Sequence, residues 1–389
     1  MICKSMKVVL STLGKFHTFD LARQLHARGA LQAVFTGYPR FKLRNEQLPS
    51  AAIRTFPWIH TPYMGTPALH LLGRRIRRHW EYVDRRALDL HVSRRLPPCD
   101  VFVGLSGSAL RSGSVARERG AQYVCDRGST HIRTQNRLLL EEHSLWGQPF
   151  KGIDPRIIDL EEAEYAQANC ITVPSSFNVQ SFINQGVPES KVKLVPYGVD
   201  LSRFRPTGRP AENRFDILFA GAMTLRKGLP YLLQAYTAFR HPQKSLTLAG
   251  SVDESFIRMM KQRHIWPADV QVLGHVAQHK LQDLMSRSHV LVLPSIEEGL
   301  AMVQAQAMAC GCPVIASEHT GARNLFDDGT EGFIVPIRDP AAIAARLQVL
   351  AQDPDLRRRM SEAALSRVRG LLGWSEYGDK AMAVYKALH

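Results

Sequence analysis

Glu297, Glu298 and Gly299 form an acidic turn between two apolar segments. The segment before them is typical of a buried strand, and the segment after them is typical of a helix. In a parallel α/β sheet this junction lies at the carboxyl edge, where nucleotides bind. The free N–H groups of the helix start would favour a phosphate, and the carboxylates would suit sugar hydroxyls. The turn therefore indicates a nucleotide-sugar site.

Arg226 and Lys227 precede Gly228 at a second expected strand-to-helix junction. Two cations and a helix N-terminus at one place fit a leaving nucleoside diphosphate. Negative charge grows on that diphosphate as the sugar–phosphate bond breaks, so fixed cations stabilise the transition state more than the ground state. The alternative is a solvated pair of charges at a helix start, and from the residues alone both interpretations stand.

The elements that position these residues alternate along the chain as short apolar strands and longer helical segments, which predicts an α/β protein. Strands are expected at 7–10, 33–35, 101–105, 122–125, 170–173, 192–195, 216–220, 245–248, 270–273, 290–293, 313–316 and 333–335. Helices are expected at 19–28, 159–167, 228–239, 276–287, 302–308 and 340–350. This makes two doubly wound, Rossmann-like series of elements.

A polar stretch rich in proline and glycine, residues 203–214, separates the two series. We therefore predict an N-terminal acceptor-binding domain at 1–197 and a C-terminal nucleotide-sugar-binding domain at 198–373. Residues 374–389 form an amphipathic helix, expected to pack back toward the N-terminal domain. Two such domains facing each other leave a cleft, and clefts between domains favour ligand sites.

Positive charge is concentrated in the first third of the chain. Residues 1–137 contain 23 Lys and Arg against 8 Asp and Glu, whereas the remaining residues contain 27 of each. The excess is densest in residues 71–97. A helix there would carry an apolar stripe flanked by arginines; the stripe is Leu69, Leu72, Ile76, Trp80 and Val83, and the arginines are Arg74, Arg75, Arg77 and Arg78.

Two interpretations of this helix stand side by side. It fits an interfacial helix on an anionic membrane surface, and it fits equally a surface helix packed on its own domain. Nucleic acid is not an expected partner, because the basic region has no zinc-finger spacing and no aromatic RNA-binding signature.

The chain of 389 residues, with 45% hydrophobic and 22% charged residues, has the composition of an ordinary globular protein. Its first apolar run is too short for a signal peptide and is better interpreted as a strand. The six cysteines are scattered, which predicts free thiols in a reducing compartment. We therefore expect a cytoplasmic protein, with the basic region as a means of peripheral attachment to the inner face of the membrane.

Four blocks of sequence, in order and with matching spacing, resemble the family 4 glycosyltransferases. These are a linker motif at 196–206, a phosphate-binding segment at 219–235, a motif of two acids separated by seven residues at 298–306, and the segment 319–335. The likeness covers roughly residues 175–347, and the first 170 residues share only its outline. The resemblance implies a retaining enzyme of two facing Rossmann-like domains, the GT-B fold.

The resemblance also implies roles in the C-terminal half. Arg226 and Lys227 would act on the leaving diphosphate, and Glu298 would contact hydroxyls of the transferred sugar. The donor-binding positions are Gly221, Glu298, Gly299, Leu300, Ala301, Met302 and Gln306. Glu297 is the alternative functional acid. Two departures occur: Gln306 replaces the second acid, which holds the ribose in the family, and Ala222 replaces an arginine that many relatives carry.

In the N-terminal half the resemblance implies further contacts around the cleft. Gly14 matches a glycine loop that approaches the donor phosphate, and Lys15 or His17 beside it would touch donor or acceptor. Arg127 takes the approximate place of a histidine that lies next to the reacting sugar in relatives. His131 follows one helical turn later as a further acceptor-binding candidate, with a structural histidine as its alternative interpretation.

No metal and no other cofactor is expected. The only Asp-x-Asp sequence, at Asp353 and Asp355, stands before an arginine-rich segment, 356–368, and is better explained as the start of that helix. Without a divalent ion, cationic side chains and helix dipoles must neutralise the diphosphate.

The resulting expectation is a metal-independent, retaining glycosyltransferase. It would move a sugar from a nucleoside-diphosphate sugar to a saccharide or lipid-linked acceptor in cell-envelope or exopolysaccharide synthesis. Two alternatives stay open: a catalytically silent nucleotide-sugar-binding partner, and an epimerase or phosphorylase on the same architecture.

Overall fold

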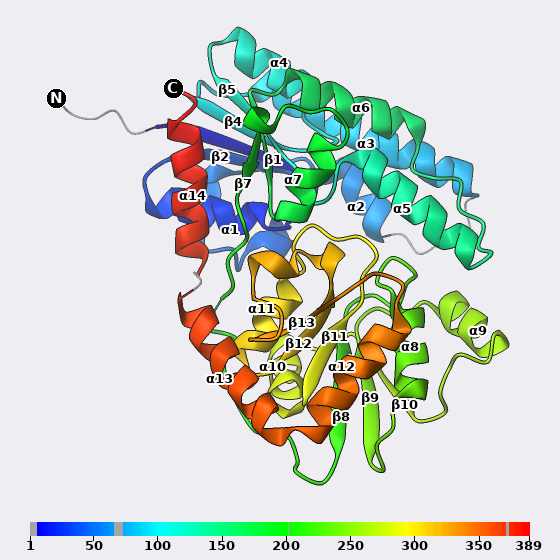
Figure 1. Cartoon of the computed structure of the whole chain (residues 1–389). Coiled ribbons are helices and arrows are strands. Elements are labelled where there is room, and N and C mark those ends of the chain that lie inside the picture. The colour runs from blue at the N-terminus through cyan, green and yellow to red at the C-terminus, as the bar shows by residue number, and fades with distance from the viewer. Residues whose placement is uncertain (1–5, 66–72, 201, 371–372) are drawn as a thin grey trace.

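The computed structural model describes residues 6–65, 73–200, 202–370 and 373–389. They form two lobes, each built on one parallel sheet (Figure 1). Within these residues the first sheet has seven strands in the order β3-β2-β1-β4-β5-β6-β7, and the second has six in the order β10-β9-β8-β11-β12-β13. In each sheet the first strand in sequence lies near the middle, and later strands are added outward on both sides. Such a sheet has a crevice at the carboxyl ends of its strands.

The first sheet is covered by helices on both faces, and most residues of its central strands are accordingly buried. Its strands are β1 (Val8–Thr12), β2 (Leu31–Thr36), β3 (Ile53–Thr55), β4 (Val101–Leu105), β5 (Gln122–Asp126), β6 (Cys170–Val173) and β7 (Val192–Leu194). Its helices are α1 (Thr18–Ala27), α2 (Pro57–Gly65), α3 (Arg74–Arg95), α4 (Leu110–Glu118), α5 (Ile132–Leu145), α6 (Pro155–Gln167) and α7 (Ser176–Ile183).

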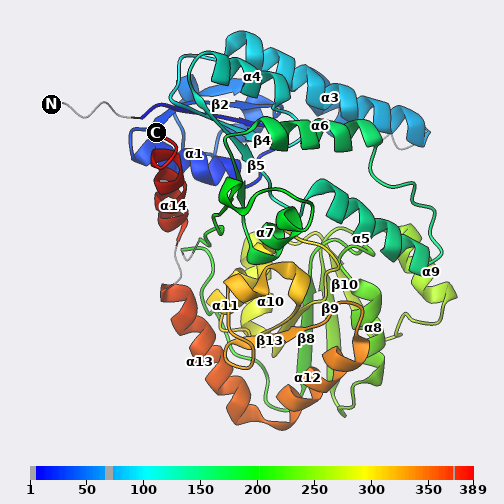
Figure 2. The same ribbon diagram turned by 45° about the horizontal axis from the view of Figure 1, so that its top comes forward.

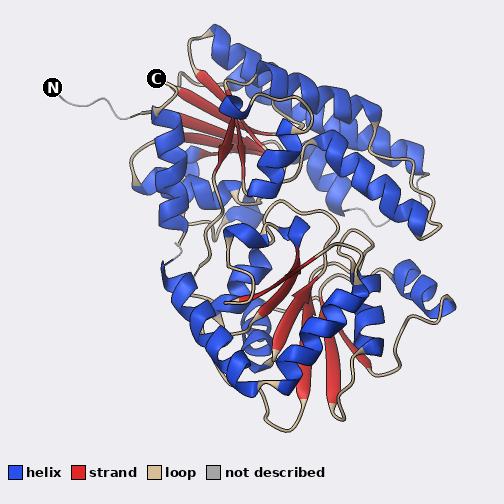
Figure 3. Cartoon of the chain, in the orientation of Figure 1, coloured by secondary structure: helices blue, strands red, loops and turns tan. Residues whose placement is uncertain are grey.

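The second sheet has the same layered construction, with helices on both sides of its strands (Figure 3). Its strands are β8 (Phe215–Ala220), β9 (Lys244–Ala249), β10 (Val270–Gly274), β11 (Val290–Leu293), β12 (Val314–Ser317) and β13 (Gly332–Val335). The helices that follow in sequence are α8 (Leu229–Ala238), α9 (Glu254–Gln262), α10 (Gln278–Arg287), α11 (Met302–Ala309), α12 (Pro340–Gln352), α13 (Pro354–Gly370) and α14 (Trp374–Lys386).

Among the described helices, α14, α5 and α7 take part in joining the lobes. Helix α14 lies against α1 of the first lobe, where Asp379 accepts a hydrogen bond of 2.7 Å from Nη2 of Arg28 and Tyr385 is buried in the core. Helix α5 extends toward the second lobe (Figure 2), and Leu138 and Trp146 pack in the core of the second sheet. The two lobes are therefore held together by apolar packing as well as by the connecting chain.

The predicted fold class is confirmed: the chain is an α/β protein of two doubly wound sheets. All twelve predicted strands are present, with ends within two residues of the predicted ones, and β3 is an additional strand. Asp353 begins α13 as predicted, because its carboxylate accepts a hydrogen bond of 2.8 Å from the Leu356 amide.

The predicted free thiols are confirmed for the described residues. Cys125, Cys170, Cys310 and Cys312 are buried free thiols and Cys99 is a partly buried one, whereas Cys3 lies outside the described residues. Along the described part of the chain, every helix is too short or too polar to span a lipid bilayer.

Candidate active site

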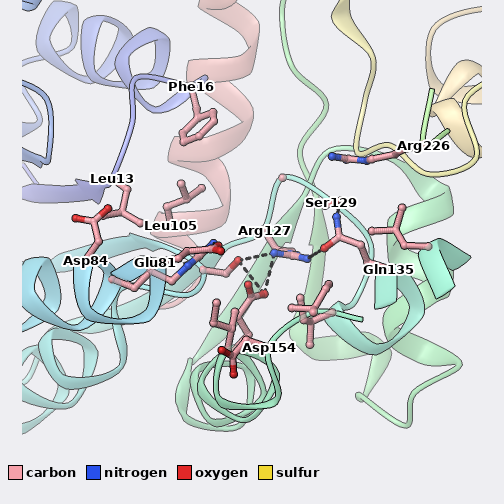
Figure 4. Close-up of a pocket in the computed structure, with 18 of the residues that line it drawn as sticks. Leu13, Phe16, Glu81, Asp84, Leu105, Arg127, Ser129, Gln135, Asp154 and Arg226 are labelled. Atoms are coloured by element: carbon pink, nitrogen blue, oxygen red, sulfur yellow. Dashed lines mark hydrogen bonds and ion pairs between the residues drawn. The ribbon is translucent and has the colours of Figure 1, made fainter. Parts of the chain in front are cut away.

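A cavity of about 1320 Å³ lies between the two lobes. Its first-lobe wall comes from α3 and from the segments that follow β1, β4 and β5, and its second-lobe wall includes Arg226 and Met302. Figure 4 shows Arg226 on one side of this cavity, with Arg127, Ser129 and Gln135 facing it from the first lobe. The cavity is thus formed where the carboxyl edges of the two sheets face each other.

The two turns singled out in the sequence lie side by side on the second lobe. The Ile296 amide donates a hydrogen bond of 2.8 Å to the Arg226 carbonyl, which joins the turn after β11 to the turn before α8. Gly228 has a φ of +65°, and a Cβ there would lie 1.9 Å from the Pro294 carbonyl oxygen. Only glycine allows that approach, so the sequence Arg226-Lys227-Gly228 is fixed against the acidic turn.

Each cation of the pair contacts one glutamate of the turn. Nη2 of Arg226 lies 2.9 Å from Oε2 of Glu297, and its Nε donates a hydrogen bond of 3.1 Å to the Glu297 carbonyl. Lys227 Nζ forms a close ion pair with Oε1 of Glu298, with the geometry of an ion pair rather than of a directed hydrogen bond. Two positive and two negative side chains are therefore concentrated at the place where the helix α8 begins.

Glu297 is fully buried and stays ionised. Burial alone would raise the pKa of its carboxyl, but the Arg226 charge and hydrogen bonds from Ser129 and Thr130 lower that pKa to about 2. Glu298 is also buried, with 8% of its surface exposed, and its backbone carbonyl accepts a hydrogen bond of 3.1 Å from Asn178 of the first lobe. Neither Glu298 nor its partner Lys227 is among the described residues that line the cavity, so both lie beside it. Glu297 is thus a fully buried interlobe carboxylate, whereas Glu298 is slightly less buried.

Gly299 lies in direct backbone contact with the first lobe. A Cβ at this position would lie 2.1 Å from the carbonyl oxygen of Gly128, which follows β5. Leu300 and Ala301 are buried beside it, and Met302 begins α11 and lines the cavity. The start of α11 therefore reaches the cavity where the two lobes touch.

Arg127 is held rigidly in the cavity wall of the first lobe. Its guanidinium lies 2.8 Å from Glu161 and donates hydrogen bonds to Ser106, at 3.2 Å, and to Gln135, at 2.8 Å. Burial would lower the pKa of Arg127, but facing negative groups, Glu161 foremost, raise it above its usual value. The side chain is a permanent buried cation that lines the predicted site.

His17 also lines the cavity, in a cluster that the sequence did not reveal. Its Nε2 lies 2.6 Å from Oδ2 of Asp126, and Oδ1 of that aspartate accepts a hydrogen bond of 2.9 Å from Thr172. The His17 ring stacks on Tyr197, with centroids 4.2 Å apart. Asp126 and Tyr197 were missed because no local pattern links them to His17, which precedes them by 109 residues or more.

Gly14, Lys15 and Gly221 are predicted positions that are not among the described residues lining the cavity. The Cβ that Gly14 lacks would collide with the Phe16 ring, and Lys15 forms an ion pair with Glu46. Gly221 directly follows β8, and its amide donates a hydrogen bond of 2.8 Å to the Ala249 carbonyl.

His131 has the structural surroundings named as its alternative interpretation. It is the N-cap of α5, accepting a hydrogen bond of 3.2 Å from the Arg133 amide, and its ring lies 5.0 Å from those of Tyr165 and Phe182. Burial lowers its pKa to about 4. It does not line the described cavity, and neither does Gln306, which is partly exposed on α11.

The fold and the cavity between facing doubly wound sheets define the GT-B class. A family profile described as Glycosyltransferase Family 4 matches residues 15–203, and one described as Glycosyl transferases group 1 matches residues 202–367. The two matches follow the two lobes and together span most of the chain. The chain belongs to the family 4 glycosyltransferases.

Two named glycosyltransferases are similar to part of this chain. It is 30% identical over 217 residues to the D-inositol 3-phosphate glycosyltransferase of Frankia alni, a match that covers 50% of this chain and 53% of that protein. It is 27% identical over 225 residues to a glycogen synthase of Mycobacterium tuberculosis, covering 56% and 53%. The chain thus spans about half the length of these relatives.

Two solved structures show the same fold over nearly the whole chain. Sucrose-phosphate synthase from Thermosynechococcus elongatus aligns with a TM-score of 0.74 at 22% identity, covering 99% of both chains. Anabaena HepE in complex with UDP and glucose aligns with a TM-score of 0.71 at 15% identity, covering 98% of this chain and 100% of that one. At these identities the likeness concerns the fold alone.

Proposed function

We propose that this protein is a metal-independent, retaining glycosyltransferase that moves a sugar from a nucleoside-diphosphate sugar to a saccharide or lipid-linked acceptor. The observation that carries the proposal is the convergence of Arg226 and Lys227 on the acidic turn beside the interlobe cavity. The cell-envelope or exopolysaccharide pathway is part of the same proposal, and it rests on the predicted acceptor class.

The donor would lie against the second lobe. Its diphosphate would contact Arg226, Lys227 and the N–H groups at the start of α11, and its sugar would contact Glu298. Gln306 would face the ribose as a neutral hydrogen-bonding group. The complexes of HepE with UDP and with UDP-glucose support this class of donor, because that protein has the same fold.

Arg226 and Lys227 would stabilise the charge that develops on the leaving diphosphate. Fixed charges in a water-poor site need no reorganisation during reaction, which makes them effective there. In place of a metal, these side chains and the N-terminus of α8 would supply the positive potential. Arg127 and His17 line the opposite wall of the cavity, and they would meet the transferred sugar and the acceptor.

The carboxylates around the cavity bear on the stereochemistry. Each carboxylate in its described lining is already paired with a basic side chain: Asp20 with Arg23, Glu81 with Arg85, Asp84 with His60, Asp154 with Arg156, and Glu161 with Arg127. A retaining hydrolase uses one of two closely spaced carboxylates as its nucleophile. Because each of these five is held on the cavity wall by a basic side chain, we propose none of them as a nucleophile. We propose instead attack on the same face as the departing phosphate, which would accept the acceptor proton.

A nucleotide screen tests the proposed function. One of UDP, GDP or ADP is expected to stabilise the protein against heat, by about 2.7 kcal/mol at a concentration of 100 Kd. The matching nucleotide sugar should then be hydrolysed slowly in the absence of acceptor. Stabilisation without any hydrolysis or transfer would indicate the catalytically silent partner, and no stabilisation by any nucleotide would contradict the proposal.

The acceptor side of the proposal includes a membrane surface. Trp58 and Met64 on α2 are 77% and 63% exposed, and Ile76 on α3 is 50% exposed beside the exposed Arg75 and Arg77. The predicted stripe residues Leu69 and Leu72 lie outside the described residues. Exposed apolar side chains next to arginines fit the interface of an anionic bilayer, where each cation contributes about 1 kcal/mol.

Vesicle sedimentation tests this surface. The protein is expected to sediment with vesicles that contain phosphatidylglycerol at low salt and to be released at high salt. Trp58→Ser should weaken the binding severalfold, whereas Leu145→Ser, at another well-exposed apolar site on α5, should not. Failure to sediment at low salt would contradict membrane attachment without affecting the donor proposal.

A further inference from the structure

Glu297 is the carboxylate at which the two lobes meet. Its Oε1 accepts hydrogen bonds from the Ser129 hydroxyl at 2.5 Å, the Thr130 hydroxyl at 2.9 Å and the Thr130 amide at 3.1 Å. Its Oε2 accepts one from Gln135 at 3.0 Å. All four donors belong to the first lobe, and the carboxylate that receives them belongs to the second.

The same carboxylate holds the cation proposed to meet the diphosphate. Arg226 uses Nε and Nη2 on Glu297, and its Nη1 has no partner among the described residues. The Arg226 side chain is 39% exposed and lines the cavity. One edge of the guanidinium is therefore fixed, and the remaining nitrogen is available to a ligand.

The hydrogen bonds from the first lobe also change how strongly Glu297 neutralises Arg226. With four donors in place, the negative charge of the carboxylate is shared among Ser129, Thr130, Gln135 and Arg226. If the lobes separate, Arg226 is the only one of these partners that stays on the same lobe. The net positive potential that Arg226 offers to a diphosphate is therefore greatest when the lobes are closed.

We propose that Glu297 is a positioning residue of the donor site, which orients Arg226 toward the diphosphate and depends on Ser129, Thr130 and Gln135 of the other lobe to do so. The inference rests on the proposed function, because it requires a nucleoside diphosphate as ligand. Closure of the lobes would then strengthen binding of the diphosphate, and binding of the diphosphate would favour closure to the same extent. Thr130 of the first lobe would therefore contribute to donor binding through Glu297 and Arg226, without contacting the donor itself.

Nucleotide affinity of matched variants tests the inference. Isothermal titration uses UDP, GDP or ADP, whichever the wild type binds most tightly. Glu297→Gln turns a donor group toward Arg226 and Gln135, and is expected to weaken binding at least tenfold. Thr130 is fully buried, and Thr130→Val keeps the shape of its side chain while removing one hydrogen bond from the first lobe to Glu297. This variant is expected to weaken nucleotide binding severalfold.

Glu142→Gln is the matched control. Glu142 of α5 is equally buried and also joins the lobes, through Arg338 at 2.8 Å and Tyr231 at 2.9 Å, but it does not touch Arg226. The affinity of the Glu142→Gln variant for the nucleotide should stay within about threefold of that of the wild type. Circular dichroism confirms that each variant is folded before titration.

The outcomes separate the inference from the function it rests on. Wild-type protein that binds none of the three nucleotides would overturn both. A wild type that binds, together with a Glu297→Gln variant of equal or tighter affinity, would overturn the positioning role alone, since the carboxylate would then merely compete with the diphosphate for Arg226. Equal weakening by Glu297→Gln and Glu142→Gln would likewise overturn it, because loss of any interlobe contact would then weaken nucleotide binding.

Discussion

Lys227→Ala is expected to slow sugar transfer by a factor of about 100 to 1000, with most of the loss in kcat. Losses of this size follow removal of one group that stabilises charge developing in a transition state. Lys227 is proposed to act on the leaving diphosphate, whose charge is greatest at that point, so kcat should fall more than KM rises. Steady-state kinetics with the donor selected by the nucleotide screen measures both.

Two companion variants make the Lys227 result interpretable. Lys280→Ala removes an exposed lysine on α10 of the same lobe and should leave kcat unchanged. Lys227→Arg keeps the charge and should recover part of the activity. Because Lys227→Ala also leaves Glu298 without its cation, thermal unfolding must show that the variant is folded. Transfer within threefold of wild type by a folded Lys227→Ala protein would contradict the assigned role.

Gly299→Ala is expected to reduce transfer by at least 100-fold while leaving each lobe folded. The added methyl group would lie 2.1 Å from the carbonyl oxygen of Gly128 and 2.7 Å from its carbonyl carbon, and these are backbone atoms of the other lobe. A backbone neighbour cannot rotate away as a side chain can, so the lobes must separate. Separation would widen the cavity and remove Arg127 and His17 from the donor, which misplaces the reacting groups.

Small-angle scattering and kinetics together test the Gly299 prediction. The variant should have a larger radius of gyration than wild type, with helical content unchanged by circular dichroism. Gly370→Ala is the control, because a methyl group there meets no atom within 4 Å and the φ angle is an ordinary one. A Gly299→Ala protein with normal activity would show that the contact between Gly128 and Gly299 is not needed for catalysis.

The fold was largely predictable because parallel strands buried on both faces are continuous apolar runs. β11, with the sequence VLVL, is such a run, and β8, with FDILFA, is interrupted only by Asp216. β3 was missed because it has only three residues, Ile53–Thr55, at the edge of the sheet. Its pairing with β2, rather than its own sequence, defines it as a strand.

Helix α5 shows a different limit of sequence reasoning. It was not among the expected helices, and nothing in its local sequence states which lobe buries its apolar residues. The structure packs Leu138 against the second sheet although α5 follows a strand of the first. Tertiary packing of this kind depends on residues far away in the chain, and a single sequence carries no signal for it.

The candidate site, like the fold, was predictable where local sequence patterns define it. Strand-to-helix junctions identified Arg226, Lys227 and the acidic turn, because loops at the carboxyl edge of parallel strands meet at one place. The partners of Glu297 were not predictable, since Ser129, Thr130 and Gln135 precede it by 162 to 168 residues. The sequence also left Glu297 and Glu298 as alternatives, and burial now distinguishes the constrained acid from the more accessible one.

The central claim is that a nucleoside diphosphate binds between Arg226, Lys227 and the start of α11. A crystal structure of the protein with the nucleoside diphosphate that the screen selects tests this claim most directly. The account predicts both phosphate groups within hydrogen-bonding distance of the Arg226 and Lys227 side chains and of backbone N–H groups in residues 299–302. A diphosphate bound elsewhere, with those two side chains turned away from it, would contradict the account.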